Sequence, residues 1–373
     1  MHYFDHSATA KTLKEAAGAA CAMMTEDYGN PSSSHAMGIC AEKAVEESRK
    51  ELAAALGAKP KELYFTSGGT ESINTAIFGA VQRNRRLGNH IVTSQIEHSA
   101  TLACAKRLQA EGYEVTFLPP EKNGGVSAAA VEDALRADTI LVSLMLVNNE
   151  TGAVLPLEQI GKMLQKKPAL FHVDGVQALF KMPCLPKRYG ADFMSFSGHK
   201  IGAPKGIGAL YIRDGVQIRP YLVGGGQERG FRSGTENTPG IAGFGAACRV
   251  RRASMEQDIQ TVAALRRELE QRLMAEFPFA KINGSSGIPH VLNVSLEGCK
   301  SEVMLRVLEG DGVYVSAGSA CAKGHESHVL AAMGLSNGRI DSALRISLAS
   351  SNTKEDIEAL IQAMRKGVAM LRR

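Results

Sequence analysis

The sequence LYFTSGGTES at residues 63–72 joins a short β-rich run to a glycine pair and then to a helical pattern. Small residues whose backbone N–H groups point outward from a helix N-terminus form a site for an anion such as phosphate. The pattern matches neither GxxxxGK[ST], the nucleotide-binding loop, nor GxGxxG, the dinucleotide-binding turn. Taken alone, it fits an ordinary helix cap equally well.

The same unit, a strand-like run followed by a helical pattern, recurs through the first two-thirds of the chain. In residues 41–56 the apolar side chains fall on one helical face, and Gly57 supplies a C-terminal stop. Strands alternating with helices predict βαβ units and a largely parallel sheet covered on both faces. The expected strands are 63–65, 91–93, 115–118, 139–147, 170–173, 193–196 and 208–212.

A glycine-rich run at 224–234 interrupts this pattern, and a second set of elements follows it. We expect a large domain of residues 15–250, and a smaller α/β domain formed by residues 1–14 and 251–373. The expected elements after the glycines are a long helix from about 239 to 277, a strand at 291–296, a helix at 300–309, strands at 313–316 and 343–348, and a final helix from 354.

Composition excludes several classes of protein. The 373 residues, 44% hydrophobic and 22% charged, are enough for a sizeable core, and the dispersed net charge of +5 indicates no nucleic-acid surface. There is no apolar run of about 18 residues for a membrane span, and no hydrophobic run of a secretory signal at the start. The seven cysteines form no CxxC pair, so a cytoplasmic protein without disulfides is expected.

Polar residues follow two further expected strands, at the edge where open parallel sheets bind ligands. Asp174 ends the strand in HVDGVQ (172–177), and Gln177 lies about one helical turn later. A single acid in this position is more often a helix cap than a ligand. The alternative is a carboxylate that holds the cationic ring nitrogen of a ligand.

Lys200 closes the segment SFSGHK (195–200) and is followed by glycines. A lysine at the end of a buried strand is poorly explained as a solvated charge, and desolvation would free its amine for Schiff-base chemistry. Taken alone, an ordinary lysine at a strand end is still the commoner case. A phosphate cradle, an acid for a ring nitrogen and a Schiff-base lysine are together what pyridoxal 5'-phosphate requires of a protein. The sequence therefore predicts this cofactor.

Segments spread nearly end to end, in consistent order and spacing, carry a family resemblance. They are FDHSAT near the start, GNPSSSH (29–35), FTSGGTES (65–72), EH (97–98), NNETG (148–152), HVDGVQ (172–177), SFSGHKIGAPKGIG (195–208), GGGQERGFRSGTEN (224–237), AGSAC (317–321) and LRISL (344–348). With these segments the chain resembles the class V branch of fold-type I pyridoxal-phosphate enzymes and, within it, the cysteine desulfurases of the NifS/IscS type. This resemblance implies a mostly parallel seven-stranded sheet in the large domain, a small domain that carries a catalytic cysteine loop, and a homodimer.

The resemblance also implies a role for each matching residue. Lys200 would hold the cofactor as a Schiff base, Asp174 would pair with the ring nitrogen, and Gln177 would pair with the ring hydroxyl. His98 would stack on the ring and act as an acid/base group. Gly69, Thr70, Ser197 and His199 would bind the phosphate, and Thr235 would reach the phosphate of a neighbouring subunit. Asn149 would contact the cofactor and, with Arg345, orient the substrate, whose carboxylate suits the arginine fork.

Cys321 in AGSAC separates a desulfurase from an aminotransferase. By the resemblance, Lys200 removes the Cα proton of L-cysteine, and the Cys321 thiolate attacks the substrate sulfur, leaving a persulfide and L-alanine. The sulfur would then pass to an acceptor protein for iron–sulfur cluster assembly or tRNA thiolation. We expect the other cysteines to be inert.

Other interpretations stay open. A second class V activity, that of an aminotransferase or a selenocysteine lyase, is the enzymatic alternative, and a catalytically silent partner protein is the non-enzymatic one. Cys321, His325 and His328 have the spacing of partial zinc ligands, but a fourth ligand is not evident, so no metal is expected. Two features depart from the family pattern. His6 stands where Asn is commoner, and the segment from Cys321 to Val329 is slightly short.

Overall fold

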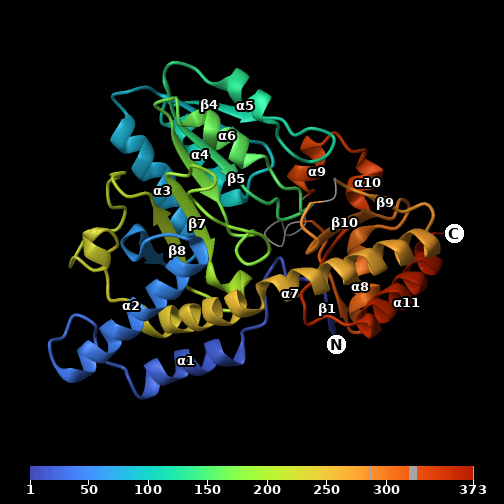
Figure 1. Ribbon diagram of the computed structural model, residues 1–373. Helices are drawn as coiled ribbons and strands as arrows, with labels where there is room; N and C mark the ends of the chain where they lie inside the picture. Colours follow the sequence, from blue (N-terminus) through green and yellow to red (C-terminus); the bar gives the residue numbers. More distant parts are fainter. Residues whose placement is uncertain (285–286, 319–325, 373) are drawn as a thin grey trace.

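A seven-stranded sheet forms the centre of the protein in the computed structural model, which describes residues 1–284, 287–318 and 326–372 (Figure 1). The strand order is β2-β8-β7-β6-β5-β3-β4, and β8 runs antiparallel to both of its neighbours while the other pairs are parallel. The predicted strands and the largely parallel sheet are thus confirmed. The strands are β2 (Leu63–Thr66), β3 (His90–Ser94), β4 (Glu114–Leu118), β5 (Thr139–Met145), β6 (Leu170–Asp174), β7 (Phe193–Ser197) and β8 (Gly208–Ile212).

Helices cover both faces of this sheet, because successive strand residues point to opposite sides. In β7, Phe193 joins the core under α3 (Gly69–Asn84) and α4 (Ser99–Ala110), whereas Met194 and Phe196 join the core on the other face. The helices of that second face are α1 (Lys14–Thr25), α2 (Ala36–Leu56), α5 (Ala128–Ala134), α6 (Leu157–Leu164) and the first half of α7 (Thr238–Glu276). Short 3-10 turns are η1 (Pro60–Glu62), η2 (Gly198–Lys200) and η3 (Glu228–Gly230).

The C-terminal elements build a second, smaller core. An antiparallel sheet has the order β12-β10-β9, and a parallel pair joins β1 to β11. Phe4 packs in this core with side chains of α8 and α11. The elements are β1 (His2–Tyr3), β9 (Lys281–Ile282), β10 (Val291–Ser295), α8 (Ser301–Gly310), β11 (Val313–Tyr314), α9 (His328–Ala332), α10 (Asn337–Asp341), β12 (Ala343–Ser347) and α11 (Lys354–Leu371).

The 39-residue helix α7 connects the two cores and runs along the base of the molecule, from α1 and α2 to α11 (Figure 1). Ile241, Phe244, Ala247 and Cys248 of this helix belong to the core of the large sheet. Val262, Leu265, Leu269 and Leu273, further along the helix, belong to the smaller core. The helix is continuous through residue 250, so the division of the chain at that residue stays a prediction. The pairing of β1 with β11 places residues 2–3 beside the C-terminal elements, whereas Leu13 packs against the core of the large sheet, so the grouping of residues 1–14 with the smaller domain also stays a prediction. None of the helices in the described ranges is long and apolar enough to cross a membrane.

A buried ion pair attaches the glycine-rich segment 224–234 to the large sheet. The Arg49 and Glu228 side chains are 4% and 3% exposed, and two hydrogen bonds of 2.8 and 2.9 Å join guanidinium to carboxylate. The Glu228 carboxylate also accepts a 2.8 Å bond from the backbone N–H of Phe65 in β2. This arrangement holds the segment against the strand that leads into the LYFTSGGTES turn.

Glu228→Ala is expected to lower the free energy of unfolding by about 3–5 kcal/mol, because it leaves the Arg49 guanidinium buried without the buried carboxylate of Glu228 as its partner. Chemical denaturation of the cofactor-free protein measures this. Glu46 contacts the same arginine but is 48% exposed, so Glu46→Ala should cost less than about 1 kcal/mol. Equal losses in the two variants would contradict the assignment.

Candidate active site

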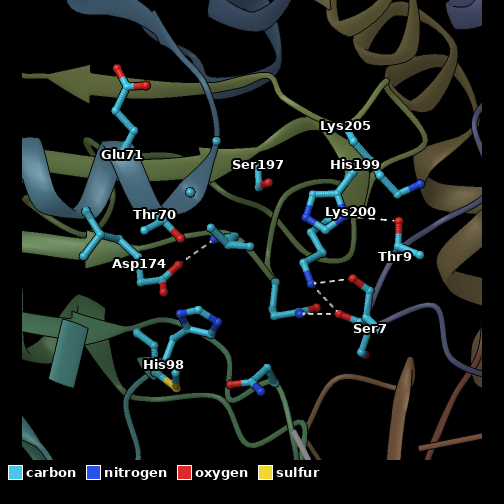
Figure 2. Close-up of a pocket in the computed structure, with 18 of the residues that line it drawn as sticks. Ser7, Thr9, Thr70, Glu71, His98, Asp174, Ser197, His199, Lys200 and Lys205 are labelled. Carbon is cyan, nitrogen blue, oxygen red and sulfur yellow. Dashed lines mark hydrogen bonds between the residues drawn. The ribbon is translucent and has the colours of Figure 1, made fainter. Parts of the chain in front are cut away.

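The carboxyl ends of β2, β3, β5, β6 and β7 meet at a pocket of about 460 Å³ (Figure 2). Open parallel sheets bind ligands at this edge. The pocket contains most of the residues singled out in the sequence, although they come from distant parts of the chain. Those that line it are Gly69, Thr70, His98, Asn149, Asp174, Gln177, Ser197, His199, Lys200 and Arg345.

Close backbone packing places the start of α3 beside the end of β7. Gly68 has φ +155°, a conformation that favours glycine. A Cβ on Gly208 would lie 2.5 Å from the Phe196 carbonyl oxygen and 2.6 Å from the Gly68 Cα, so only glycine fits there. This contact brings Gly69, the first residue of α3, next to Ser197. The helix N-terminus and the Ser197 hydroxyl together can hold an anion.

Lys200 lies on the 3-10 turn that follows β7, and its Nζ points into the pocket. The amine donates hydrogen bonds of 2.6 and 2.9 Å to the backbone oxygens of Ser7 and Ala8. Gln177 Nε2 donates to the same Ser7 oxygen at 3.0 Å. The N-terminal segment therefore orients both side chains, a role that the sequence did not reveal although FDHSAT stood out as a motif.

Asp174 is a buried carboxylate at the end of β6, 6% exposed. Its Oδ1 accepts a 2.9 Å bond from the Val176 N–H. Burial raises the pKa of Asp174 to about 6, and the charge of Lys200 opposes this rise. The cost of burying the negative charge of Asp174 is thus only partly offset by its neighbours. A cationic ligand beside the carboxylate would stabilise the charged form.

Asp174→Asn is expected to stabilise the ligand-free protein above about pH 6 and to leave it unchanged below about pH 4. In the folded protein the pKa of Asp174 lies above the ordinary value of 3.8. Its protonated form therefore contributes fully to the free energy of unfolding at low pH, and this contribution is lost as the pH rises through 6. The gain at pH 8 should be about 3 kcal/mol.

Denaturant titrations at pH 4 and pH 8 test this, with Asp192→Asn as the matched control. Asp192 is 7% exposed and accepts bonds from Arg213 and the Phe171 N–H. Its neutralisation should therefore destabilise the protein at pH 8. Destabilisation by Asp174→Asn at pH 8 would be the contrary result.

His98 is the N-cap of α4, and its Nδ1 accepts a 3.1 Å bond from the Ala100 N–H. This bond places the ring hydrogen on Nε2. Burial, followed by the positive charge of Lys200, lowers the pKa of His98 to about 4. At neutral pH the ring is therefore uncharged and offers Nε2–H to a ligand.

Glu97, directly before His98, was not recognised from the sequence as part of the site. Its side chain is fully buried, and Oε1 accepts bonds from Ser94 Oγ and the Met145 N–H at 2.6 and 3.1 Å. Burial raises the pKa of Glu97 to about 8. These hydrogen bonds connect the loop that carries His98 to β3 and β5. The EH motif at residues 97–98 is the feature of the sequence that could have identified Glu97.

Arg345 on β12 brings the smaller core to the pocket. The guanidinium is almost completely buried; Nη2 donates to Asp5 Oδ1 at 2.7 Å and Nη1 donates to the Asn149 backbone oxygen at 3.2 Å. Asp5 belongs to the same N-terminal segment that contacts Lys200. In that segment Thr9 Oγ1 also lies 3.2 Å from Nδ1 of His199, whose pKa is lowered to about 4, mainly by burial.

Thr235 does not line this pocket. It is exposed and lies in an adjoining pocket, which shares Ser67 and Gly206 with the first. Its predicted contact with a neighbouring subunit stays a prediction.

Cys321 lies outside the described residues, but the chain on either side of residues 319–325 is placed. The Ser327 hydroxyl donates to Glu150 Oε2 at 2.5 Å, and a Cβ on Gly318 would lie 3.6 Å from the same oxygen. Glu150 directly follows Asn149, which lines the pocket. The described residues Gly318 and Ser327 therefore both lie beside Glu150, next to a residue that lines the pocket.

No cluster of three or more His, Cys, Asp or Glu side chains suited to a metal ion occurs in the part of the chain that the structure describes. Of the partial zinc pattern, Cys321 and His325 lie outside that part. His328 lies within it, and its Nε2 is 3.0 Å from the Glu97 backbone oxygen.

Comparison with known proteins identifies the family. The family model "Aminotransferase class-V" matches residues 2–360. The chain is 43% identical to cysteine desulfurase IscS of Methanosarcina thermophila, covering 99% of this chain and 92% of that protein. It is 40% identical to cysteine desulfurase IscS of Clostridium botulinum strain Hall, covering 98% and 93%.

Solved structures agree with these relatives. A NifS-like protein superposes with a TM-score of 0.94 at 36% identity, covering 99% of both chains. SspA in complex with cysteine superposes with a TM-score of 0.85 at 34% identity, covering 95% of this chain and all of that one. The chain therefore belongs to the class V aminotransferase family and, within it, to the cysteine desulfurases.

Proposed function

We propose that this protein is a pyridoxal 5'-phosphate-dependent cysteine desulfurase, which converts L-cysteine to L-alanine and keeps the sulfur as a persulfide on Cys321. The convergence of Lys200, Asp174 and His98 in one pocket carries the proposal (Figure 2). The relatives that are cysteine desulfurases support the reaction, and the similarity to SspA in complex with cysteine supports the substrate.

The donor set of the pocket fits the cofactor. Asp174 is a buried, incompletely compensated carboxylate, which a protonated ring nitrogen would stabilise. Lys200 would hold the aldehyde carbon, Gln177 would contact the ring hydroxyl, and the phosphate would lie at Gly69, Thr70, Ser197 and His199. When bound, pyridoxal phosphate withdraws electrons from the substrate Cα–H bond.

The protein's own groups then handle the protons. Lys200 Nζ, held in place by the Ser7 and Ala8 oxygens, would take the Cα proton of L-cysteine. His98 keeps a proton on Nε2 at neutral pH, because Nδ1 is occupied by the Ala100 N–H. It would therefore act as a hydrogen-bond donor to the ligand.

Arg345 and Asn149 would bind the substrate carboxylate, and Arg345→Lys tests this. A guanidinium offers a carboxylate two parallel hydrogen bonds, which an ammonium group cannot reproduce. We expect the KM for L-cysteine to rise roughly 10- to 100-fold, with a smaller change in kcat, because the loss corresponds to one or two charge-assisted bonds. Steady-state alanine formation measures both constants.

Arg266→Lys is the control for that experiment. Arg266 is also buried, but it contacts Glu270 and the Val291 backbone oxygen away from the pocket. The KM should stay unchanged in this variant. A KM effect of Arg345→Lys no larger than that of Arg266→Lys would argue against carboxylate binding by Arg345.

Cys321 would receive the substrate sulfur. The contacts of Gly318 and Ser327 with Glu150, the residue after Asn149, support this proposal. Thr235 would contact the phosphate of a neighbouring subunit in a homodimer, consistent with its exposure beside the pocket. The persulfide would pass to an acceptor protein, such as an iron–sulfur scaffold or a thiolation carrier, in a reducing cytoplasm.

Product analysis tests the proposal against the alternatives. Purified holoenzyme supplied with L-cysteine and a thiol reductant should form L-alanine and sulfide in equal amounts. An aminotransferase would form a keto acid instead, and a catalytically silent protein would form neither. A strong preference for L-selenocysteine over L-cysteine would favour a selenocysteine lyase.

A further inference from the structure

Lys181 is a partly buried lysine that the mechanism proposed above does not use. It lines a small neighbouring cavity and does not line the active-site pocket. Its Nζ donates a 2.8 Å hydrogen bond to Oε1 of Gln177, and Gln177 does line the pocket. Lys181 is therefore connected to the active site through the side chain of Gln177.

The side-chain amide of Gln177 is held at both of its ends. Oε1 accepts the bond from Lys181, and Nε2 donates to the Ser7 backbone oxygen at 3.0 Å. An ammonium group can only donate and a carbonyl oxygen can only accept, so these two partners fix which end of the amide is the oxygen. Turning the amide over would break both hydrogen bonds.

The amide can consequently offer the pocket only one kind of group. Its nitrogen carries two hydrogens, and within the described part of the chain the Ser7 oxygen is the one acceptor bonded to Nε2. The second N–H is available to a ligand, whereas the oxygen is already bonded to Lys181. A ligand atom that contacts this amide should therefore be a hydrogen-bond acceptor.

The backbone between Gln177 and Lys181 holds the lysine in this position. The Lys181 N–H donates to the Ala178 oxygen at 2.9 Å, and the preceding residue, Phe180, has φ +59°. This left-handed conformation is unusual for a bulky residue. The Phe180 side chain belongs to the core of the large sheet, so core packing stabilises the turn that brings Lys181 back onto Gln177.

The two hydrogen bonds of the Gln177 amide do not depend on Lys200. Lys200 also donates to the Ser7 oxygen, but it would give up that bond on holding the cofactor aldehyde. Gln177 and Lys181 would keep theirs, because neither side chain forms a covalent bond with the cofactor. The arrangement therefore applies to the holoenzyme.

We propose that Lys181 is a positioning residue for the cofactor: it holds the Gln177 amide so that Nε2–H, rather than Oε1, faces the oxygen of the ring hydroxyl. This inference rests on the proposed function, in which Gln177 contacts that hydroxyl. The site would accordingly favour the deprotonated ring oxygen, which can only accept hydrogen bonds. The positive charge of Lys181 would favour the same form.

Two ligands that differ by a single oxygen atom test the proposal. They are pyridoxal 5'-phosphate and 3-deoxypyridoxal 5'-phosphate, which lacks the ring hydroxyl. Absorbance titration of the cofactor-free protein gives both dissociation constants without turnover, and their ratio is the preference for pyridoxal phosphate. Lys181→Met should lower this preference roughly tenfold, as expected for one charge-assisted hydrogen bond. Binding of the 3-deoxy compound should stay unchanged.

Control variants separate positioning from a general loss of packing. Lys187→Met, which removes an exposed lysine nearby, should keep the preference of the unaltered protein. Gln177→Ala should lose it, and adding Lys181→Met to Gln177→Ala should lower it no further, because Lys181 acts through Gln177. A disturbance of packing alone would weaken the binding of both ligands equally.

Equal weakening of the two ligands in Lys181→Met, or an unchanged preference, would overturn the proposal. If this variant does not fold, a crystal structure of the unaltered holoenzyme decides. Gln177 should then lie within hydrogen-bonding distance of Lys181 through Oε1 and of the ring oxygen through Nε2, and a Lys181 turned away from Gln177 would overturn the proposal. Failure of the unaltered protein to bind either ligand would instead contradict the proposed function, and this inference with it, so the two failures are distinguishable.

Discussion

Lys200→Ala is expected to lower kcat for L-cysteine by about 10⁴-fold or more, because it removes both the anchoring amine and the base for the Cα proton. The fold should persist, since Lys200 lines a pocket and its hydrogen bonds to Ser7 and Ala8 are made to backbone oxygens rather than to buried core side chains. Alanine formation measures the loss. Borohydride reduction followed by peptide mapping should attach the cofactor to the Lys200 peptide in the unaltered protein.

Lys205→Ala is the matched control for this prediction. Lys205 lines the same pocket and lies five residues further along the chain, but it has no position in the proposed chemistry. We expect its kcat to change by less than about tenfold. Comparable losses in the two variants, or borohydride attachment at a lysine other than Lys200, would contradict the assignment.

Cys321→Ala is expected to reduce sulfur release from L-cysteine by roughly a thousandfold or more, because it removes the proposed sulfur acceptor and none of the cysteines in the described ranges lines the pocket. Cofactor absorbance should be unchanged, since the proposed cofactor ligands are all other residues. An aminotransferase activity would survive the substitution. The test is persulfide and alanine formation, with Cys21→Ala, an exposed cysteine, as the control that should keep full activity.

The raised pKa values of several other cysteines support the choice of Cys321 as the sulfur acceptor. Burial raises the pKa of Cys104 to about 12 and raises the pKa values of Cys184, Cys248 and Cys299 as well. The Asp27 carboxylate, hydrogen-bonded to the exposed thiol, raises the pKa of Cys40. A thiol with a raised pKa forms little thiolate and is a poor nucleophile. These five cysteines are therefore unsuited to carry a persulfide.

The large sheet could be predicted from the sequence because each strand is a short β-rich run bounded by polar residues or glycine. Even so, some element ends differ. Helix α2 begins at Ala36 rather than 41, since His35 Nδ1 caps it through the Gly38 N–H while its first turn is mostly exposed and shows no apolar pattern. Strand β5 ends at Met145 rather than 147, where the chain turns to line the pocket with Val147.

The site residues that could be identified from the sequence, such as Lys200 and Asp174, are side chains that lie in characteristic motifs. Contacts made by backbone atoms or by buried acids could not be identified in this way. The carbonyl oxygens of Ser7 and Ala8 carry no side-chain signature, although they orient Lys200. Glu97 holds the loop of His98 because its side chain is buried between strands, and this burial depends on tertiary packing rather than on a local sequence pattern.

The central claim, that the sulfur of L-cysteine moves to Cys321, is tested most directly by a single turnover with ³⁵S-labelled L-cysteine and no reductant. Peptide mapping then locates the label while alanine is counted in the same sample. We predict one labelled sulfur on the Cys321 peptide, released by a thiol reductant, for each alanine formed. Alanine without protein-bound label, or label on a different cysteine, would contradict the account.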